Sequence, residues 1–416
     1  MRGDAADGSL EALREGNRLR VVDALRRSGT ATRSELAQLT GLSRTTVATL
    51  VGDLQSAGLV VGADDGESAA RSGGRGRPPA LLRLDPSAGV ALGIDLGHSH
   101  VRVAVADLSS ALLAEADAPV DVDHDADGAL DTASRLVDDV LAQAGVERDR
   151  VVGAGMGLPG PYDRGRQMVN SATILPGWVG RVAPDELSTR IGVQVEADND
   201  ANLGALGELT FGAGRGISNG VYVKISTGIG GGLIVGGALH RGATGIAGEL
   251  GHVQVQADGL SCNCGGRGCL QTVAAVPGLL AAARGAHGPD LELAGLIELV
   301  RSGDFGTRRI VGEAGRAIGR VLADLCNHVN PEAIIVGGDL SAVGEPLLAG
   351  IREAIDRYAL PGAAEAVDVR AAVLGERAEV LGALSLVIAD TERLRSAGLA
   401  ALVRAGSRQE VSAGST

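Results

Sequence analysis

Two segments of this 416-residue chain repeat one pattern, an apolar strand followed by a glycine turn and a second strand. The first reads VALGIDLGHSHVRVAVADL from Val90 and turns at Gly97. The second has strands at Gly220–Ile225 and 233–235, joined by a turn that reads STGIGGG. A pattern that recurs in this way is typical of an internal duplication. We therefore predict an α/β body whose two related halves face a shared cleft.

The composition favours a folded protein without a membrane span. Hydrophobic residues make up 45% of the chain and charged residues 21%, which allows a large core and argues against wholesale disorder. Every apolar run is interrupted before it reaches about 18 residues, the length of a membrane helix. The N-terminus is charged and lacks the apolar stretch of a secretory signal. We expect a cytoplasmic protein with no membrane partner and two or three domains.

Further strands and helices follow the glycine turns at the spacing of α/β units. Strands are expected at 112–119, 151–156, 193–197 and 333–336, and helices at 128–144, 201–209 and 307–329. We divide the chain into a head of residues 1–85, a body of residues 86–405 and a loose tail of residues 406–416.

The head has the order helix, helix, short turn, helix and two-stranded hairpin. Helical spacing covers residues 9–28, and a second helix is expected over 33–40 with Leu36 and Leu39 facing inward. Ser43 is the expected cap of a third helix that ends near Gly58. Strands at 59–61 and 80–84 complete the pattern of a winged helix-turn-helix, which is a DNA-binding fold.

The N-terminal part of the third helix is the candidate recognition surface, because a recognition helix presents these residues to base edges in the major groove. Hydroxyl side chains and arginine suit base and phosphate contacts, and an extended Arg-Gly-Arg-Pro string in the wing suits a narrow A·T minor groove. The residues predicted to contact DNA are Ser43, Arg44, Thr45, Thr46 and Thr49 of the helix and Arg75 and Arg77 of the wing. The alternative is a three-helix domain whose polar face is merely solvated.

Charge separates the head from the body. Residues 1–83 carry 12 basic and 10 acidic side chains, whereas the remainder carries 26 basic and 41 acidic ones. Only the head could therefore face a polyanion such as double-stranded DNA. So small a domain makes few phosphate contacts alone, and we expect a homo-oligomer, dimer or tetramer, on paired half-sites.

A cysteine cluster is the most specific local signal for chemistry. Cys262, Cys264 and Cys269 lie within eight residues among glycines, with His252 ten residues upstream. Three thiols and one imidazole are a ligand set typical of structural zinc. A disulfide is the alternative, but it would leave one thiol unpaired. Cys326 lies in a helical apolar pattern and is expected to be an inert core residue.

Candidate ligand-binding groups surround this cluster. Asp200 follows a strand beside Asn199 and is placed to act as a general base, although an aspartate there also serves as a helix N-cap. Glu249 could contact a ligand or hold His252. The STGIGGG turn could cradle phosphate or be only a turn. Lys224 is the sole lysine in the chain. The scarcity of lysine reflects the overall composition, and we infer no function from it.

Taken together, the motifs resemble those of the ROK family, which includes bacterial glucokinases and sugar-responsive repressors. The resemblance covers about residues 15–400. Its motifs are GIDLG at 93–97, GLPGP at 157–161, LPGW at 175–178, DNDAN at 198–202, STGIGGGLI at 226–234, GELGH at 248–252, CNCGGRGC at 262–269 and NPEAIIVGG at 330–338. The family fold that this implies is a duplicated ribonuclease-H-like, actin-like ATPase body. The preceding head resembles the DNA-binding half of the family's repressors.

The resemblance implies roles for individual residues. Asp200 would be the catalytic base where catalysis survives, and His252 would bind zinc through one ring nitrogen and sugar through the other. The implied sugar-binding residues are Gly160, Asn170, Asn199, Asp200, Glu249, His252 and Gln271. The implied phosphate- or nucleotide-binding residues are Asp95, Gly97, Ser99, Ser226, Thr227, Gly228, Gly230, Gly337 and Gly338.

Two departures from the family's kinases bear on activity. His98 stands where the kinases have a second glycine in the first phosphate loop, and a side chain there hinders approach of the backbone to phosphate. Gln271 stands where they have a sugar-binding glutamate, which weakens a charge-assisted hydrogen bond. ATP-Mg would be a cofactor only if kinase activity is retained.

Three functional hypotheses follow. The first is a DNA-binding transcriptional regulator of carbohydrate genes that responds to a sugar or sugar derivative in its body. The alternative is an ATP-dependent sugar kinase that carries an accessory DNA-binding head. The third is a zinc-stabilised scaffold with neither ligand nor catalysis.

Overall fold

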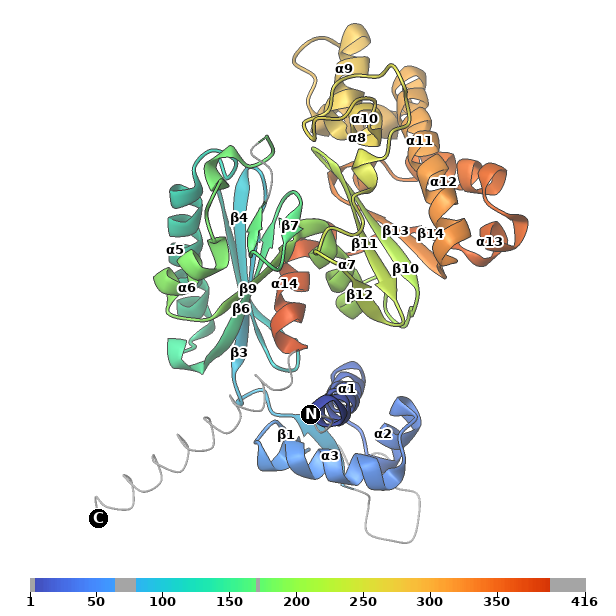
Figure 1. Cartoon of the computed structure of the whole chain (residues 1–416). Coiled ribbons are helices and arrows are strands. Elements are labelled where there is room, and N and C mark those ends of the chain that lie inside the picture. The colour runs from blue at the N-terminus through green and yellow to red at the C-terminus, as the bar shows by residue number, and fades with distance from the viewer. Residues whose placement is uncertain (1–3, 64–79, 170–172, 390–416) are drawn as a thin grey trace, which may run out of the picture.

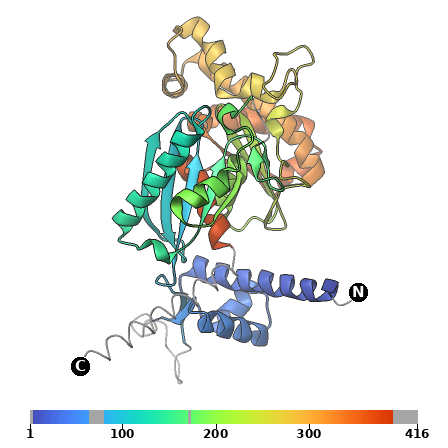
Figure 2. The ribbon, with the colours of Figure 1, turned by 60° about the vertical axis from the view of Figure 1, so that its left-hand side comes forward.

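The computed structural model of the protein describes residues 4–63, 80–169 and 173–389. A helical head lies against one end of a larger two-lobed α/β body (Figures 1 and 2). In the described part of the chain, no helix is long and apolar enough to cross a membrane.

The head is a winged helix-turn-helix, as its sequence predicts. Its elements are α1 (Asp4–Ser28), α2 (Arg33–Thr40), α3 (Arg44–Ser56), β1 (Val60–Gly62) and β2 (Leu82–Leu84). The two strands pair antiparallel, Val60 opposite Leu84. Thr32 caps α2 in a capping box with Glu35, and Gly41 ends it in the left-handed conformation.

The prediction that Leu39 faces inward is wrong. Its side chain is 57% exposed, whereas Leu36 is fully buried. Ala37 also packs against the head core, so the inward face of this two-turn helix is centred between residues 36 and 37. Leu39 lies more than a quarter-turn from that centre and therefore points to solvent.

The first lobe of the body is built on one five-stranded sheet. Its strands and helices are β3 (Val90–Leu96), β4 (His100–Asp107), β5 (Leu112–Pro119), α5 (Ala126–Ala144), η2 (Arg148–Arg150), β6 (Val151–Leu158), β7 (Tyr162–Asp163), β8 (Met168–Val169), η3 (Pro176–Trp178), α6 (Ala183–Ile191) and β9 (Val195–Asn199). The strand order is β5-β4-β3-β6-β9. The first three strands are antiparallel, and β6 and β9 continue the sheet in parallel.

The second lobe repeats this topology. Its strands are β10 (Gly220–Ile225), β11 (Ile229–Val235), β12 (Ala238–His240), β13 (Ala333–Gly337) and β14 (Asp368–Ala371). They pair in the order β12-β11-β10-β13-β14, again with an antiparallel hairpin followed by two parallel strands. The predicted duplication is confirmed.

Helices cover both sheets. Those of the second lobe and the C-terminus are α7 (Asp200–Phe211), η4 (Leu250–His252), α8 (Leu270–Ala274), α9 (Val276–His287), α10 (Leu293–Ser302), α11 (Phe305–Val329), η5 (Asp339–Val343), α12 (Glu345–Tyr358), α13 (Pro361–Ala366), η6 (Gly375–Arg377) and α14 (Ala378–Ile388). Cys326 is fully buried within α11, as expected. Helices α7 and α14 pack together between the two sheets (Figure 1).

Helix α14 approaches the first sheet closely because glycines lie beneath it. A Cβ on Gly93 would lie 2.3 Å from the carbonyl oxygen of Val380, and one on Gly155 would lie 2.0 Å from that of Ala383. Helix α14 is thus held against the first lobe although it follows the second in sequence. This return places its first turn at the interface between the lobes.

The turn in the STGIGGG segment is shorter than predicted from the sequence, which places it between strands at 220–225 and 233–235. Strand β11 begins at Ile229, and Gly230 pairs with Lys224 of β10. A Cβ on Gly232 would lie 2.4 Å from the Cβ of Ala205 in α7. These glycines therefore serve close packing of a helix on a strand, and the turn is confined to residues 226–228.

Candidate functional site

The predicted recognition face of α3 is turned to solvent. Its apolar side chains Val47, Leu50, Val51 and Leu54 are all buried in the head core. The opposite face leaves Arg44, Thr45 and Thr49 exposed at the helix start. A helix N-terminus carries unpaired backbone N–H groups, so this end is suited to phosphate as well as to base edges.

Ser43 begins this helix as predicted. Its Oγ accepts a hydrogen bond of 3.1 Å from the backbone N–H of Thr46 and lies 2.7 Å from the hydroxyl of Thr46. The hydroxyl of Thr49 donates to the carbonyl of Thr45. Ser43 and Thr46 therefore help to fix the helix end, and Arg44 and Thr45 are its most available side chains. Arg75 and Arg77 of the wing lie outside the described residues.

The second site lies between the lobes at the start of α7. Asn199 is the N-cap and accepts hydrogen bonds from the backbone N–H groups of Ala201 and Asn202. Its side-chain amide donates to the carbonyl of Gly160, at 2.8 Å. Because Asn199 caps the helix, Asp200 is not its N-cap and is the first helical residue.

The carboxylate of Asp200 accepts from three kinds of donor. Its Oδ1 accepts from the backbone N–H of Ala201 at 2.8 Å and from the side-chain amide of Asn199 at 3.0 Å. Its Oδ2 lies 2.9 Å from Nζ of Lys224, and the same ammonium lies 3.1 Å from Oε1 of Glu379 on α14. Helix α7, strand β10 and helix α14 thus meet at one ammonium group. The interlobe site is defined here as Asp95, Asn199, Asp200, Lys224, Glu249 and Glu379.

A neighbouring ion-pair cluster ties the lobes together at Asp198. This aspartate is fully buried, and its Oδ2 accepts from Arg164 at 3.1 Å and from Nε of Arg241 at 2.6 Å. Arg164 belongs to the β7–β8 hairpin of the first lobe, whereas Arg241 follows β12 of the second. Asp198 therefore joins the two lobes beside the start of α7.

Histidine side chains occupy the first glycine turn. Nδ1 of His98 lies 2.7 Å from Oδ1 of Asp123, and Nε2 of His100 lies 3.2 Å from Oδ2 of Asp95. The His100 ring is close to the turn, since a Cβ on Gly97 would lie 2.2 Å from its Cε1. Ser99 is exposed beside them. The predicted first phosphate loop is thus lined by imidazole rings.

The second glycine turn is tied to the strand-end loop that follows β13. Ser226 is buried, and its Oγ accepts from the backbone N–H of Asp339 at 3.2 Å. Thr227 is exposed at the tip. Gly337 provides room for Tyr222, whose hydroxyl would lie 2.4 Å from a Cβ at that position, and Gly338 has φ +77°. Packing accounts for these two glycines without a nucleotide.

The predicted metal ligands come together. Sγ of Cys262 lies 3.6 Å from Nδ1 of His252, and Sγ of Cys264 lies 3.7 Å from Sγ of Cys269. All four donor atoms lie within 4.8 Å of one another, so this group could hold a metal ion. The backbone N–H of Gly266 points to Cys264 and lowers the pKa of that thiol.

Glu249, His252 and Gln271 connect this group to the interlobe site. Nδ1 of His252 faces the thiols, while its Nε2 lies 3.6 Å from Oε2 of Glu249. Burial and the charge of Asp200 raise the pKa of Glu249 to about 7. Gln271 donates its amide to Sγ of Cys262 at 3.2 Å. Asn170, another predicted sugar contact, lies outside the described residues.

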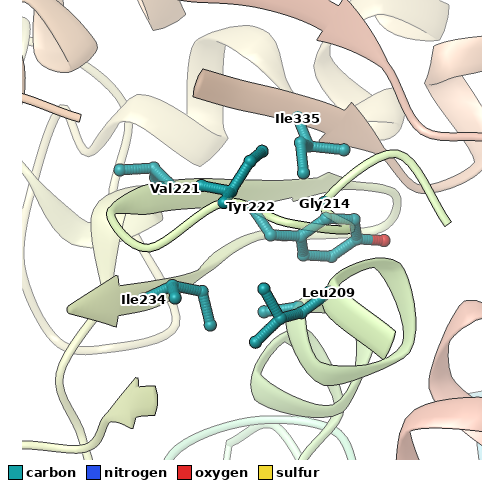
Figure 3. Close-up of a pocket in the computed structure, with 9 residues that line it drawn as sticks. Leu209, Gly214, Val221, Tyr222, Ile234 and Ile335 are labelled. Carbon is teal, nitrogen blue, oxygen red and sulfur yellow. The ribbon is translucent and has the colours of Figure 1, made fainter. Parts of the chain in front are cut away.

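A small pocket in the second lobe is lined by none of the predicted site residues (Figure 3). It lies between α7 and the sheet and is lined by two glycines and by Ala, Leu, Val and Ile side chains around Tyr222. The Tyr222 hydroxyl has no hydrogen-bond partner among the described residues, and burial raises its pKa well above 10. An apolar lining with one hydroxyl does not suit a polyhydroxylated ligand.

Four charged residues of this region have no role predicted from the sequence, namely Arg164, Lys224, Arg241 and Glu379. A signal was available for Lys224, since a lone lysine lies in an otherwise apolar strand next to a glycine turn. No local pattern marks the two arginines or Glu379, because their partners are distant in sequence.

These features define a winged-helix protein with a duplicated α/β body and a polar site between its lobes. The family model described as the ROK family matches residues 91–390, and that of the MarR family matches residues 15–69. The chain therefore belongs to the ROK family.

Relatives of two kinds match this chain. The xylose repressor of Caldicellulosiruptor bescii is 28% identical over 92% of the chain and 98% of its own length. The glucokinase of Thermotoga maritima is 34% identical over 71% of the chain and 96% of its own length. The repressor match is too long to leave out the head, whereas the glucokinase match covers about the same share of the chain as residues 91–390, which the ROK family model matches.

Solved structures divide in the same way. A ROK family transcriptional regulator described as a homolog of the Escherichia coli MLC protein has a TM-score of 0.75 and covers 94% of this chain, at 24% identity. A ROK family glucokinase from Streptomyces griseus, in complex with glucose and AMPPNP, has a TM-score of 0.63 and covers 72%, at 32% identity. The whole-chain architecture, head included, is that of the first.

Proposed function

We infer that this ROK protein is a sugar-responsive transcriptional repressor. The observation that carries the inference is its architecture. Repressor relatives align with head and body together, and the head exposes Arg44 and Thr45 at the N-terminus of a capped helix. A sugar kinase without a DNA-binding head would have neither the whole-chain match to repressors nor this exposed helix start.

The proposed partner of the head is a double-stranded DNA operator. The N-terminal residues of α3 would enter the major groove, with Arg44 at base edges or phosphate. Ser43, Thr46 and Thr49 would support or extend these contacts, and Arg75 and Arg77 of the wing would reach the flanking minor groove. A single head is small, and a homodimer on a palindromic operator, or a tetramer, is the proposed assembly.

The proposed effector is a sugar or sugar derivative at the interlobe site. Asn199, Asp200 and Glu249 present amide and carboxylate groups that suit sugar hydroxyls, and the second ring nitrogen of His252 faces the same region. Gly160, Asn170 and Gln271 complete the proposed contact set. Binding there would favour one arrangement of the lobes, by the difference in affinity between the two arrangements.

We propose zinc as the ion of the Cys3His group. Tetrahedral zinc with Zn–S bonds of about 2.3 Å requires ligand atoms about 3.7 Å apart. The observed 3.7 Å between Cys264 and Cys269 and 3.6 Å between Cys262 and His252 fit this requirement. Zinc would tie the 252–269 loop together and hold the His252 ring beside Glu249.

Helix α14 is the proposed connection between the effector site and the head. Glu379 in its first turn binds Lys224 of the second lobe. At its other end, the carbonyl of Ile388 accepts from Arg26 of α1 at 3.4 Å. A change in lobe arrangement that moves Glu379 would therefore move the helix that contacts the head.

The proposed function is tested by operator capture and effector response. The full-length zinc-loaded protein should select palindromic genomic fragments, with binding that weakens steeply as salt rises. Xylose, glucose or N-acetylglucosamine should then change that affinity. Binding no tighter than to random DNA of equal length would contradict the proposal.

The role of α14 has its own test. Arg26→Met should retain operator binding but respond less to the effector sugar than Arg27→Met, a change at an exposed arginine one residue away. An equal response in the two variants would show that this contact does not carry the signal.

An ATP-dependent hexose kinase is the second candidate function. The 34% identity with a glucokinase and the position of Asp200 between the lobes favour it. ATP consumption with glucose, mannose, xylose or N-acetylglucosamine that disappears in Asp200→Asn would establish it. Absence of turnover alongside operator binding would leave regulation as the sole activity.

A further inference from the structure

The ammonium of Lys224 lies where the two lobes meet, and acidic side chains surround it. It lies 2.9 Å from Oδ2 of Asp200 and 3.1 Å from Oε1 of Glu379. The side chains are 18% exposed for Lys224, 14% for Asp200 and 6% for Glu379. Water therefore screens these charges only weakly.

A third carboxylate, that of Asp95, acts on Lys224 through its charge without an ion pair to it. Burial acts to lower the pKa of Lys224, but the charges of Asp200, Glu379 and Asp95 together raise it well above its ordinary value. Asp95 is 2% exposed, and its Oδ1 has no hydrogen-bond partner among the described residues. The cluster thus holds more acceptor capacity than one ammonium uses.

The duplication explains how Lys224 comes to face Asp95. Asp95 is the next-to-last residue of β3 and pairs with Gly157 of the parallel strand β6. Lys224 is the next-to-last residue of β10 and pairs with Gly337 of the parallel strand β13. The two halves therefore place opposite charges at equivalent positions, one in each lobe.

Carboxylates from β3, α7 and α14, of which those of Asp95 and Glu379 are buried and that of Asp200 is partly exposed, are the kind of oxygen donors that bind a divalent cation. Here a side-chain ammonium already stands among them. We propose that Lys224 is an internal cation that takes the place of a divalent metal ion at the interlobe site, so that the site binds its sugar without metal or nucleotide. This inference rests on the proposed function and specifies the ligand class as an uncomplexed sugar.

The sole lysine allows a direct test in the unmodified protein. In full-length zinc-loaded protein labelled with 13C-lysine, every lysine signal comes from Lys224. Stoichiometric Mn²⁺ should leave the Cε signal sharp, and Mg²⁺ should not shift it. Paramagnetic broadening at stoichiometric Mn²⁺ would show that a metal binds beside the ammonium and would overturn the proposal.

Removal of the ammonium should create a metal site. Lys224→Met should bind Mn²⁺ at least about tenfold more tightly than the wild type, and Mn²⁺ or Mg²⁺ should raise its unfolding temperature. Lys224→Arg keeps the charge and should gain no Mn²⁺ binding. The gain should disappear again in Lys224→Met combined with Asp95→Asn.

Each outcome bears on the proposal. A folded Lys224→Met that binds Mn²⁺ no better than the wild type would overturn it. If Lys224→Met folds only in Mn²⁺ or Mg²⁺, that rescue supports it, and the lysine signal of the wild type tests it without any variant. Operator binding by the wild type is measured separately, so its absence would remove the proposed function whatever the Mn²⁺ result.

Discussion

The two halves of the body share a backbone plan but differ in charge at their meeting point. Each has a hairpin, a glycine turn and two parallel strands in the same order. At the equivalent position next to the turn, the first half carries Asp95 and the second carries Lys224. A duplicated fold can thus carry opposite charges at one repeated position, and the ion pairs that join the elements here are those of Lys224 with Asp200 and Glu379.

The halves differ also in what surrounds these charges. Oδ2 of Asp95 is hydrogen-bonded to His100, whose side chain is 40% exposed. Oδ1 of Asp95 has no hydrogen-bond partner among the described residues. Lys224 is enclosed by two nearly buried carboxylates. Only the second half, within the described residues, has a group of four metal-binding side chains. The second half should therefore depend more strongly on its polar groups.

The largest expected effect is loss of the metal. Cys269→Ser should lower the free energy of unfolding by more than about 3 kcal/mol, because binding of a structural metal is coupled to folding of its loop. Denaturation monitored by circular dichroism and metal content by mass spectrometry would measure it.

Cys326→Ala is the matched control, since this thiol is buried in α11 and is not a member of the metal group. It should keep full metal content. If the Cys269→Ser protein retains stoichiometric zinc and wild-type stability, the second half does not depend on its metal group for stability.

The next largest effect should come from the opposed charges. Lys224→Met should cost about 3 kcal/mol in metal-free buffer, because it leaves Asp200 and Glu379 buried without their cation. Asp95→Asn should cost about 1 kcal/mol or less, since Asp95 has one hydrogen bond, with the partly exposed His100, and acts on Lys224 through its charge without forming an ion pair with it. Urea denaturation at pH 7 compares the two variants, and equal losses would contradict the proposed asymmetry.

The head provides a test outside the duplication. Arg44→Ala should weaken operator binding by about tenfold, in line with about 1–3 kcal/mol for a good base contact, and affect random DNA less. Arg309→Ala, a change at an exposed arginine of α11, removes the same charge from the body and should have no effect. Fluorescence anisotropy measures both; equal loss on operator and random DNA would demote Arg44 to a phosphate contact.

The smallest effect is a pH dependence in the first half. The hydrogen bond with Asp95 raises the pKa of His100, against the opposing effect of burial. The stabilisation is therefore complete below the unfolded pKa of about 6.5 and disappears as pH rises through the folded value. Because the ring is 40% exposed, we expect less than about 1 kcal/mol.

Comparison of the wild type with His100→Asn in urea, from pH 5.5 to 8.5, should show their stability difference shrinking as pH rises. A difference that grows with pH would have the wrong sign for this pair.

Much of the fold follows from local pattern. The bounds of α2, β5 and β10 agree with the residues expected from periodicity and turn signals, and Ser43 begins α3 as expected. The glycines of β11 were misread as a turn because their reason is the close approach of α7, which no local window contains. Leu39 was misread for the same kind of reason, since its exposure depends on where α1 and α3 lie.

The residues of the metal group could be predicted because three of its four ligands lie within eight positions, so that the loop alone brings them together. The interlobe site depends instead on packing. Asp95, Lys224 and Glu379 are far apart in the chain, and they meet only because two similar sheets face each other and α14 returns to the first lobe. The spacing of residues along the chain is enough to predict a metal site whose ligands are close in sequence. The tertiary structure alone decides which charged side chains meet when they are far apart in sequence.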